Sequence, residues 1–179
     1  MVRNSHLKKR KHLTKDQLLP LPAESVRALS LEAHIALSVL RRGRGEAMQI
    51  GCLAKTIYLA YFMRDITPGA EIDQFQTAEL IVEDCIDRAL RGEQWELRET
   101  DYSAIERILL LYDAQLSAAP AYRFADAWQK FLNVVVGSCQ TPIDGSRVKA
   151  PTVGFAEVSE LARESVDSLG NGCPDIESR

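Results

Sequence analysis

The sequence contains no long apolar run. Its longest uninterrupted apolar stretch is Ile57 to Met63, far short of the ~20 residues that a membrane-spanning helix requires. The basic N-terminus is followed by Thr14, Lys15, Asp16 and Gln17, where a signal peptide would carry its apolar segment. These absences predict a cytoplasmic protein that does not associate with a membrane.

Cysteine is sparse, and its spacing is unlike that of a zinc site. No two of the cysteines lie within thirty residues of each other, so the local CxxC pair that most zinc sites use is missing. Scattered cysteines in an intracellular chain of this size are expected to be free thiols. We expect two of them, at positions 52 and 85, to be small core residues. The four are Cys52, Cys85, Cys139 and Cys173.

Residues arranged for catalysis or cofactor binding are also missing. Only His34, of three histidines, falls within a helical pattern, and no partner that would position it as a base is visible in the sequence. The glycines of "GRGEAMQIG", residues 43–51, lack the preceding strand and the Lys-Ser/Thr ending of a phosphate-binding loop. Glu79 and Glu83 have no histidine three residues further on, so we interpret Glu79, Glu83 and Asp87 as a solvated face. The sequence therefore predicts no enzyme, no cofactor and no metal site.

What the sequence does contain is apolar residues at helical spacing. The clearest helix start is Ser30, a good N-cap, and Gly43 stands where a left-handed residue ends a helix. Apolar residues cover more than one face of this segment, so we expect it to be largely buried. They are Leu31, Ile35, Leu37, Val39 and Leu40.

Four further segments show the same periodicity. They span residues 47–65, 70–91, a segment capped by Thr100 or Asp101, and 121–136. Short connections between amphipathic helices predict an all-α fold, a compact bundle of about five helices. The buried faces supply enough large side chains, at about 1.5–3 kcal/mol each, to fold without a metal or a disulfide.

The predicted domain layout places this bundle at residues 17–137. Residues 1–16 are expected to form a disordered basic arm, and the Leu-Pro segment 18–22 to pack as an extended strap in a groove. Gly-, Pro- and Ser-rich residues 138–154 are interpreted as a linker. A short amphipathic helix is expected at 155–169, followed by a disordered tail at 170–179.

Charge is distributed unevenly along the chain. The net charge of −3 combines about +7 in residues 1–45 with about −10 in residues 46–179. Basic side chains in the first part could each neutralise a phosphate, which would give salt-dependent contacts with DNA but no sequence preference. The alternative is a solubilising tail, or one that folds back on the acidic body. The candidate contacts are Lys8, Lys9, Arg10, Lys11, Lys15, Arg41, Arg42 and Arg44.

Three stretches of the chain resemble a family of bacterial proteins. They are "LLPLPAESVRALSLEAHIALSVLRRGRGE", "AKTIYLAYFM" and "ERILLLYDAQLSAAP". The chain is similar over about residues 13–136 to hypothetical proteins of plasmids and mobile elements that are commonly labelled Fis family transcriptional regulators. The resemblance implies a bacterial, cytoplasmic, helical protein, and it carries over no binding residue.

Two functional interpretations remain open at this stage. The first is a non-enzymatic regulatory or accessory protein that contacts nucleic acid through its basic N-terminal region. The second is a helical protein-interaction module, with no nucleic-acid role, that meets a protein partner or a second copy of itself. For this second interpretation, the expected contacts are the acidic helix 70–91 or the helix 155–169.

Overall fold

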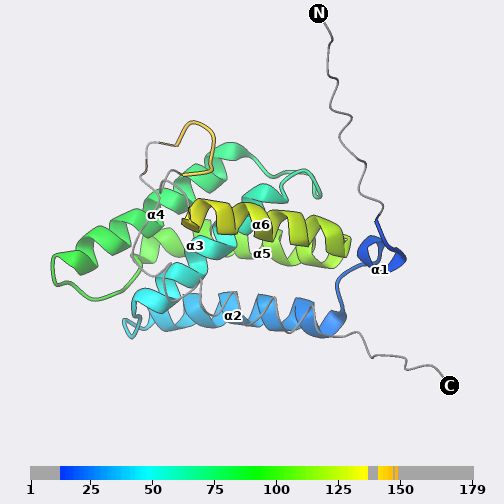
Figure 1. The fold of residues 1–179 in the computed structure, drawn as a ribbon. Coiled ribbons are helices and arrows are strands. Elements are labelled where there is room, and N and C mark those ends of the chain that lie inside the picture. Colours follow the sequence, from blue (N-terminus) through cyan, green and yellow to red (C-terminus); the bar gives the residue numbers. More distant parts are fainter. Residues whose placement is uncertain (1–12, 137–140, 147, 149–179) are drawn as a thin grey trace, which may run out of the picture.

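The computed structural model describes residues 13–136, 141–146 and 148, and these form the helical bundle shown in Figure 1. Within them every regular element is a helix, which confirms the predicted all-α fold. Lys8, Lys9, Arg10, Lys11 and the predicted helix 155–169 lie outside the described residues. The helices are α1 (Lys15–Leu18), α2 (Ala23–Arg41), α3 (Ala47–Phe62), α4 (Ile72–Leu90), η1 (Glu99–Asp101), α5 (Tyr102–Ala118) and α6 (Ala121–Val136).

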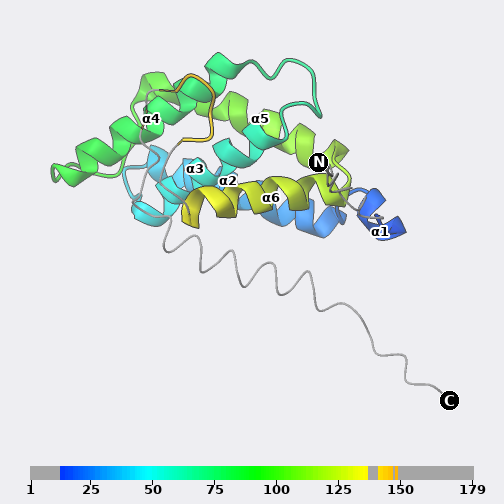
Figure 2. The same cartoon turned by 45° about the horizontal axis from the view of Figure 1, so that its top comes forward.

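Helix α3 is the centre of the bundle. Every residue from Ile50 to Tyr61 is buried, as expected for a helix that is apolar on all sides. It contacts α2, α4, α5 and α6, and the views in Figures 1 and 2 show these helices arranged around it. Among the described helices, none is both long and apolar enough to cross a bilayer.

Helix α2 begins eight residues earlier than predicted. Its N-cap is Pro22 rather than Ser30, because proline has a backbone φ suited to a helix start and needs no N–H partner there. Val26 and Leu29 of the added turns pack against the core. The longer helix buries only one face, so the prediction that this segment is largely buried was wrong. The buried residues of α2 are Ala33, Ala36, Leu37 and Leu40.

The segment before α2 is more ordered than predicted. Thr14 and Gln17 form a capping box around the short helix α1, so Lys15 is helical and not part of a disordered arm. The Leu-Pro strap is held mainly through its backbone, where the carbonyl of Leu19 accepts a 2.8 Å hydrogen bond from the N–H of Ala121. Of its three leucines, Leu21 packs against the core while Leu18 and Leu19 are exposed.

Glycines with positive φ follow two of the helices, and one of them, Gly43, was predicted from the sequence to have this conformation. Gly43, after α2, has a φ of 62°, and Gly92, after α4, has a φ of 93°. The start of α5 agrees with the predicted cap at Thr100 or Asp101 in position but not in its bonding. The 3-10 turn η1 precedes it, and Asp101 occupies the N-cap position without a side-chain capping bond.

Residues 141–146 and 148 are packed against the bundle, contrary to the predicted linker. Ile143 is only 2% exposed, and Val148 is also buried. The backbone N–H of Asp144 donates to the Tyr61 hydroxyl at 3.1 Å, and Gln76 Nε2 donates to the Asp144 carbonyl at 2.7 Å. These contacts attach the segment, called here the 141–148 strap, to α3 and α4. Lack of helical period in the sequence therefore did not mean lack of packing.

Candidate functional site

Two polar contacts join α2 to α5 along the surface of the bundle. His34 Nε2 lies 2.9 Å from Asp113 Oδ2, and Arg41 lies 3.5 Å from Glu106. Arg41 comes seven residues after His34 on α2, whereas its partner Glu106 comes seven residues before Asp113 on α5. The two helices therefore run antiparallel. The sequence showed no partner for His34 because Asp113 is 79 residues away along the chain. Both side chains are partly exposed, and the pair links two helices at the surface.

The outer face of α2 carries apolar side chains into solvent. Leu31 is 60% exposed and Ile35 is 51% exposed, and they lie one helical turn apart on the same side. Leu110 of α5 is 64% exposed and lies between Glu106 and Asp113 in the sequence. We define the outer face of α2 by six exposed residues that lie opposite its buried face. They are Glu24, Ala28, Leu31, Ile35 and Ser38 within the helix, and its C-cap residue Arg42.

This face was missed by the sequence analysis, although a signal for it exists. Starting the helix at Ser30 removed Glu24 and Ala28 from the pattern, so Leu31 and Ile35 were assigned to the core. The helix in fact has two apolar stripes, and the core stripe is the one that contains the small residues Ala33 and Ala36.

The predicted phosphate contacts do not form one surface. Arg41, Arg42 and Arg44 are exposed at the C-terminal end of α2, and the Arg41 guanidinium lies 4.8 Å from the Tyr102 ring centroid. Lys15 lies before the opposite end of α2, and at 1.5 Å per residue this helix is about 27 Å long. Residues 8–11 lie outside the described chain. The structure therefore brings together only the three arginines of the predicted set.

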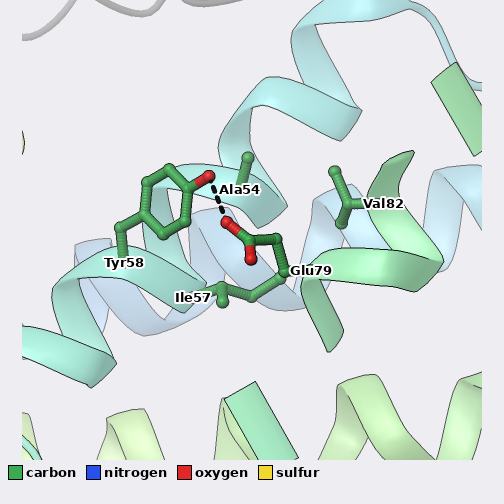
Figure 3. Close-up of a pocket in the computed structure, with 5 residues that line it drawn as sticks. All are labelled: Ala54, Ile57, Tyr58, Glu79 and Val82. Carbon is green, nitrogen blue, oxygen red and sulfur yellow. Dashed lines mark hydrogen bonds between the residues drawn. The ribbon is translucent and has the colours of Figure 1, made fainter. Parts of the chain in front are cut away.

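Glu79 is buried, and its assignment to a solvated face was wrong. It is 3% exposed and accepts a 2.7 Å hydrogen bond from the Tyr58 hydroxyl, as Figure 3 shows. The hydroxyls of Thr141 and Ser146 also donate to its carboxylate. Burial and the neighbouring Glu79 carboxylate raise the pKa of Tyr58, so the phenol stays protonated as a donor. Glu79 therefore anchors the 141–148 strap to α3 and α4.

The hollow beside Glu79 is small. It has no interior room for even a water-sized molecule, whereas ordinary ligand pockets enclose roughly 300–1,000 Å³. Alanine, isoleucine and valine side chains make up most of its lining, and the carboxylate in it is already occupied by three hydroxyls. This arrangement fits a structural role for Glu79. The lining residues are Ala54, Ile57, Tyr58, Glu79 and Val82.

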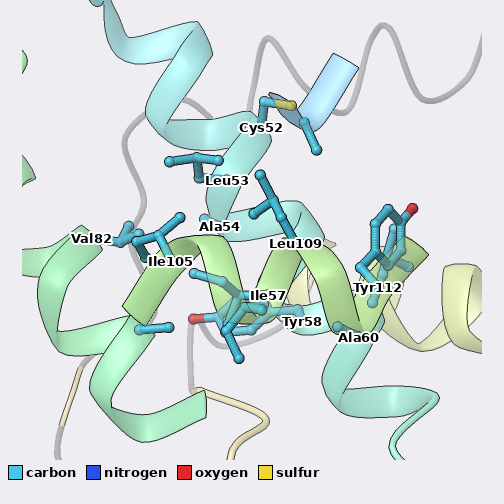
Figure 4. Packing of buried hydrophobic residues seen from close by; sticks show 14 of the residues in the cluster. Cys52, Leu53, Ala54, Ile57, Tyr58, Ala60, Val82, Ile105, Leu109 and Tyr112 are labelled. Atoms are coloured by element: carbon cyan, nitrogen blue, oxygen red, sulfur yellow. The ribbon is translucent and has the colours of Figure 1, made fainter. Parts of the chain in front are cut away.

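A second polar group lies between α2, α3 and α6. The Lys55 ammonium contacts Glu32 at 2.6 Å and lies 5.9 Å from the Trp128 ring centroid. Cys52, one turn earlier on α3, lies at the edge of the buried cluster drawn in Figure 4 and is buried as predicted. Burial raises the pKa of its thiol to about 12, so Cys52 is not a thiolate at neutral pH. These groups fasten helices together and present no reactive side chain.

Within the part of the chain that the structure describes, no group of three or more His, Cys, Asp or Glu side chains could hold a metal ion. A scan against protein-family models finds no match, and searches of curated proteins and of solved structures find no match either. The functional proposal therefore depends on the surface of the molecule itself, and on the outer face of α2 in particular.

Proposed function

We propose that this chain is a non-enzymatic regulatory or accessory protein that acts by binding another protein through the outer face of α2. The observation that carries the proposal is the exposure of Leu31 and Ile35, at 60% and 51%, on a helix whose opposite face is core. Burying a large apolar side chain contributes about 1.5–3 kcal/mol, so a partner that covers both gains substantially. In line with the sequence resemblance, we take the setting to be the bacterial cytoplasm.

The bundle supports this role by holding α2 rigid. Its inner face is fixed against α3 and α5, and its flanks are tied by Glu32 to Lys55 and by His34 to Asp113. A partner would meet apolar anchors that are already ordered, which lowers the entropy lost on binding. Anchors one turn apart are also the pattern that helix-mediated recognition uses.

Site-specific cross-linking tests the proposal. A photoreactive amino acid at position 31, in cells that contain the protein, should give a discrete adduct with another polypeptide. The matched control is position 110, which is similarly exposed on the neighbouring helix. The absence of any adduct from position 31, or equal adducts from both positions, would contradict the proposal.

A second candidate function is a phosphate contact at the end of α2. It is favoured by Arg41, Arg42 and Arg44, which are exposed within four consecutive positions. We rank it second because the described residues carry 19 Asp and Glu against 13 Lys and Arg, and because Lys15 lies elsewhere. It predicts duplex DNA binding that weakens as salt rises, and that weakens further without residues 1–16 or with R42Q and R44Q. Equal weak binding by all three proteins would count against it.

A further inference from the structure

The outer face of α2 has the spacing of a coiled-coil seam. From Glu24 to Arg42 its residues follow one another at intervals of four, three, four, three and four, which is the alternation of a and d positions in a heptad. All six are exposed, and no described helix lies beyond α2 on this side of the bundle in Figure 1. Such a seam is the surface on which a second helix packs.

The same six residues are complementary to a second copy of the seam that runs in the opposite direction. The six residues are spaced symmetrically along the helix about the level of Ala33. When a second α2 runs antiparallel to the first at this level, Leu31 faces Ile35 and Ala28 faces Ser38. At the ends, Glu24 faces Arg42. A two-fold axis requires this reciprocity, because each residue must suit the residue that it meets on the partner.

Resting on the proposed function, we propose that the partner is a second copy of this chain, paired antiparallel along α2 about a two-fold axis at Ala33. The Leu31 and Ile35 layers would form the apolar centre of the interface. The Ala28 and Ser38 layers are small, which allows the two helices to approach closely on either side of it.

The charged residues at the two ends of the seam favour a second copy as the partner, and they favour the antiparallel direction. Glu24 and Arg42 form no ion pair with any described residue, so both are free to pair across the axis. Of the charged side chains that flank the seam, Glu32 is held within the bundle by Lys55, His34 by Asp113 and Arg41 by Glu106. Arg27 is exposed and bonds to the Ala23 carbonyl of its own helix. A parallel pair would place Glu24 against Glu24 and Arg42 against Arg42. Only the antiparallel pair brings opposite charges together.

Sedimentation equilibrium of the full chain tests this proposal. The chain of 20.0 kDa should associate to twice that mass. Because each substitution changes two symmetry-related contacts, Glu24→Arg and Arg42→Glu should each weaken the dimer about tenfold. The double variant E24R/R42E should restore it, because the opposite charges face each other again. Asp126→Arg, a charge reversal at an exposed position of α6, is the control and should have no effect.

The outcomes separate this inference from the proposed function. A monomeric wild-type chain would overturn the self-pairing, while an adduct between position 31 and a different protein would leave the proposed function standing. A dimer that is indifferent to Glu24→Arg, or one that the double variant does not restore, would overturn the antiparallel arrangement. Leu31→Glu should give a monomer, and its far-ultraviolet spectrum should match the wild type because Leu31 is exposed.

Discussion

Glu79 brings a carboxylate into a part of the bundle where it is 3% exposed, and three hydroxyl groups meet it there. A buried carboxylate costs free energy unless hydrogen bonds replace its water. Tyr58 supplies one such bond from α3, while Thr141 and Ser146 supply two from the strap. This single residue therefore joins three parts of the chain.

Replacing Glu79 should destabilise the protein in proportion to the hydrogen bonds that are lost. Glu79→Ala leaves buried hydroxyls without an acceptor, and the free energy of unfolding should fall by about 2 kcal/mol or more. Glu79→Gln keeps one acceptor oxygen and should cost about 1 kcal/mol. Urea denaturation measures both values. Asp87→Ala, on the exposed side of the same helix, should stay within about 0.5 kcal/mol, and an equal effect at both positions would contradict the role of Glu79.

The environment of some of these residues could be predicted from the sequence, and that of others could not. Cys52 was predicted as core because helical spacing decides burial locally. Glu79 was interpreted wrongly because its partner Ser146 comes from a distant part of the chain, and the partner of His34, Asp113, could not be identified for the same reason. No local pattern reports a contact of that kind.

At the scale of elements, the turn between α2 and α3 depends on close approach of the backbone. A β-carbon on Gly45 would lie 2.5 Å from the carbonyl oxygen of Trp95 and 2.4 Å from Leu40 Cδ2. Gly69 is the useful comparison, since its φ is 84° but nothing lies within 4 Å of such an atom. A substitution at Gly45 therefore tests steric clash, whereas one at Gly69 tests backbone strain.

We expect Gly45→Ala to be more destabilising than Gly69→Ala. The second substitution should cost about 1–2 kcal/mol through its left-handed backbone alone. The first has no left-handed cost, but it must displace both the Trp95 carbonyl and the Leu40 side chain in a packed turn, and this overpacking should cost about 3 kcal/mol. Thermal or urea unfolding ranks the two variants, and the reverse order would show that the turn has room.

The 141–148 strap gives a second prediction at this scale. Ile143→Ala removes a side chain that is 2% exposed and should lower the free energy of unfolding by about 2 kcal/mol or more. Val136→Ala, at an exposed position of α6, should change it by less than about 0.5 kcal/mol. If Ile143→Ala were as mild as its control, the segment would be the linker that its composition suggested.

Element boundaries were predictable where glycine or proline marks them. Helix α6 spans Ala121–Val136 as expected, because Pro120 and Gly137 stand at its two ends. The start of α2 was missed because Pro22, taken as part of an extended strap, is itself the N-cap. That error of eight residues also hid Glu24 and Ala28, two of the six residues of the seam on its outer face.

At the scale of the whole molecule, the bundle is organised around one buried helix. Its interior keeps several cysteine thiols and tyrosine hydroxyls protonated. Burial raises the pKa values of Cys52, Cys85 and Tyr112, and burial together with Glu79 raises that of Tyr58. In the unfolded chain the same groups titrate near their ordinary values, about 8.5 for a thiol and about 10 for a phenol. Above those values the unfolded chain binds fewer protons than the folded one.

Stability should therefore fall as the pH rises. The free energy of unfolding keeps its full value below about pH 8 and decreases from there up to at least the folded-state pKa of Cys52, about 12, because unfolding then releases protons. Urea titrations at a series of pH values measure the slope. Cys52→Ala should reduce that slope. A stability that is constant or rising over this range would contradict the buried, protonated state of these groups.

The central claim is that α2 stabilises the bundle with one face and recognises a second copy with the other. The most direct test is the urea midpoint measured as a function of protein concentration, since association that is lost on unfolding makes stability depend on concentration. The midpoint should rise with concentration for the wild type and for Leu110→Glu, and stay constant for Leu31→Glu. A wild-type midpoint that does not change, or a Leu31→Glu midpoint that still rises, would contradict the claim.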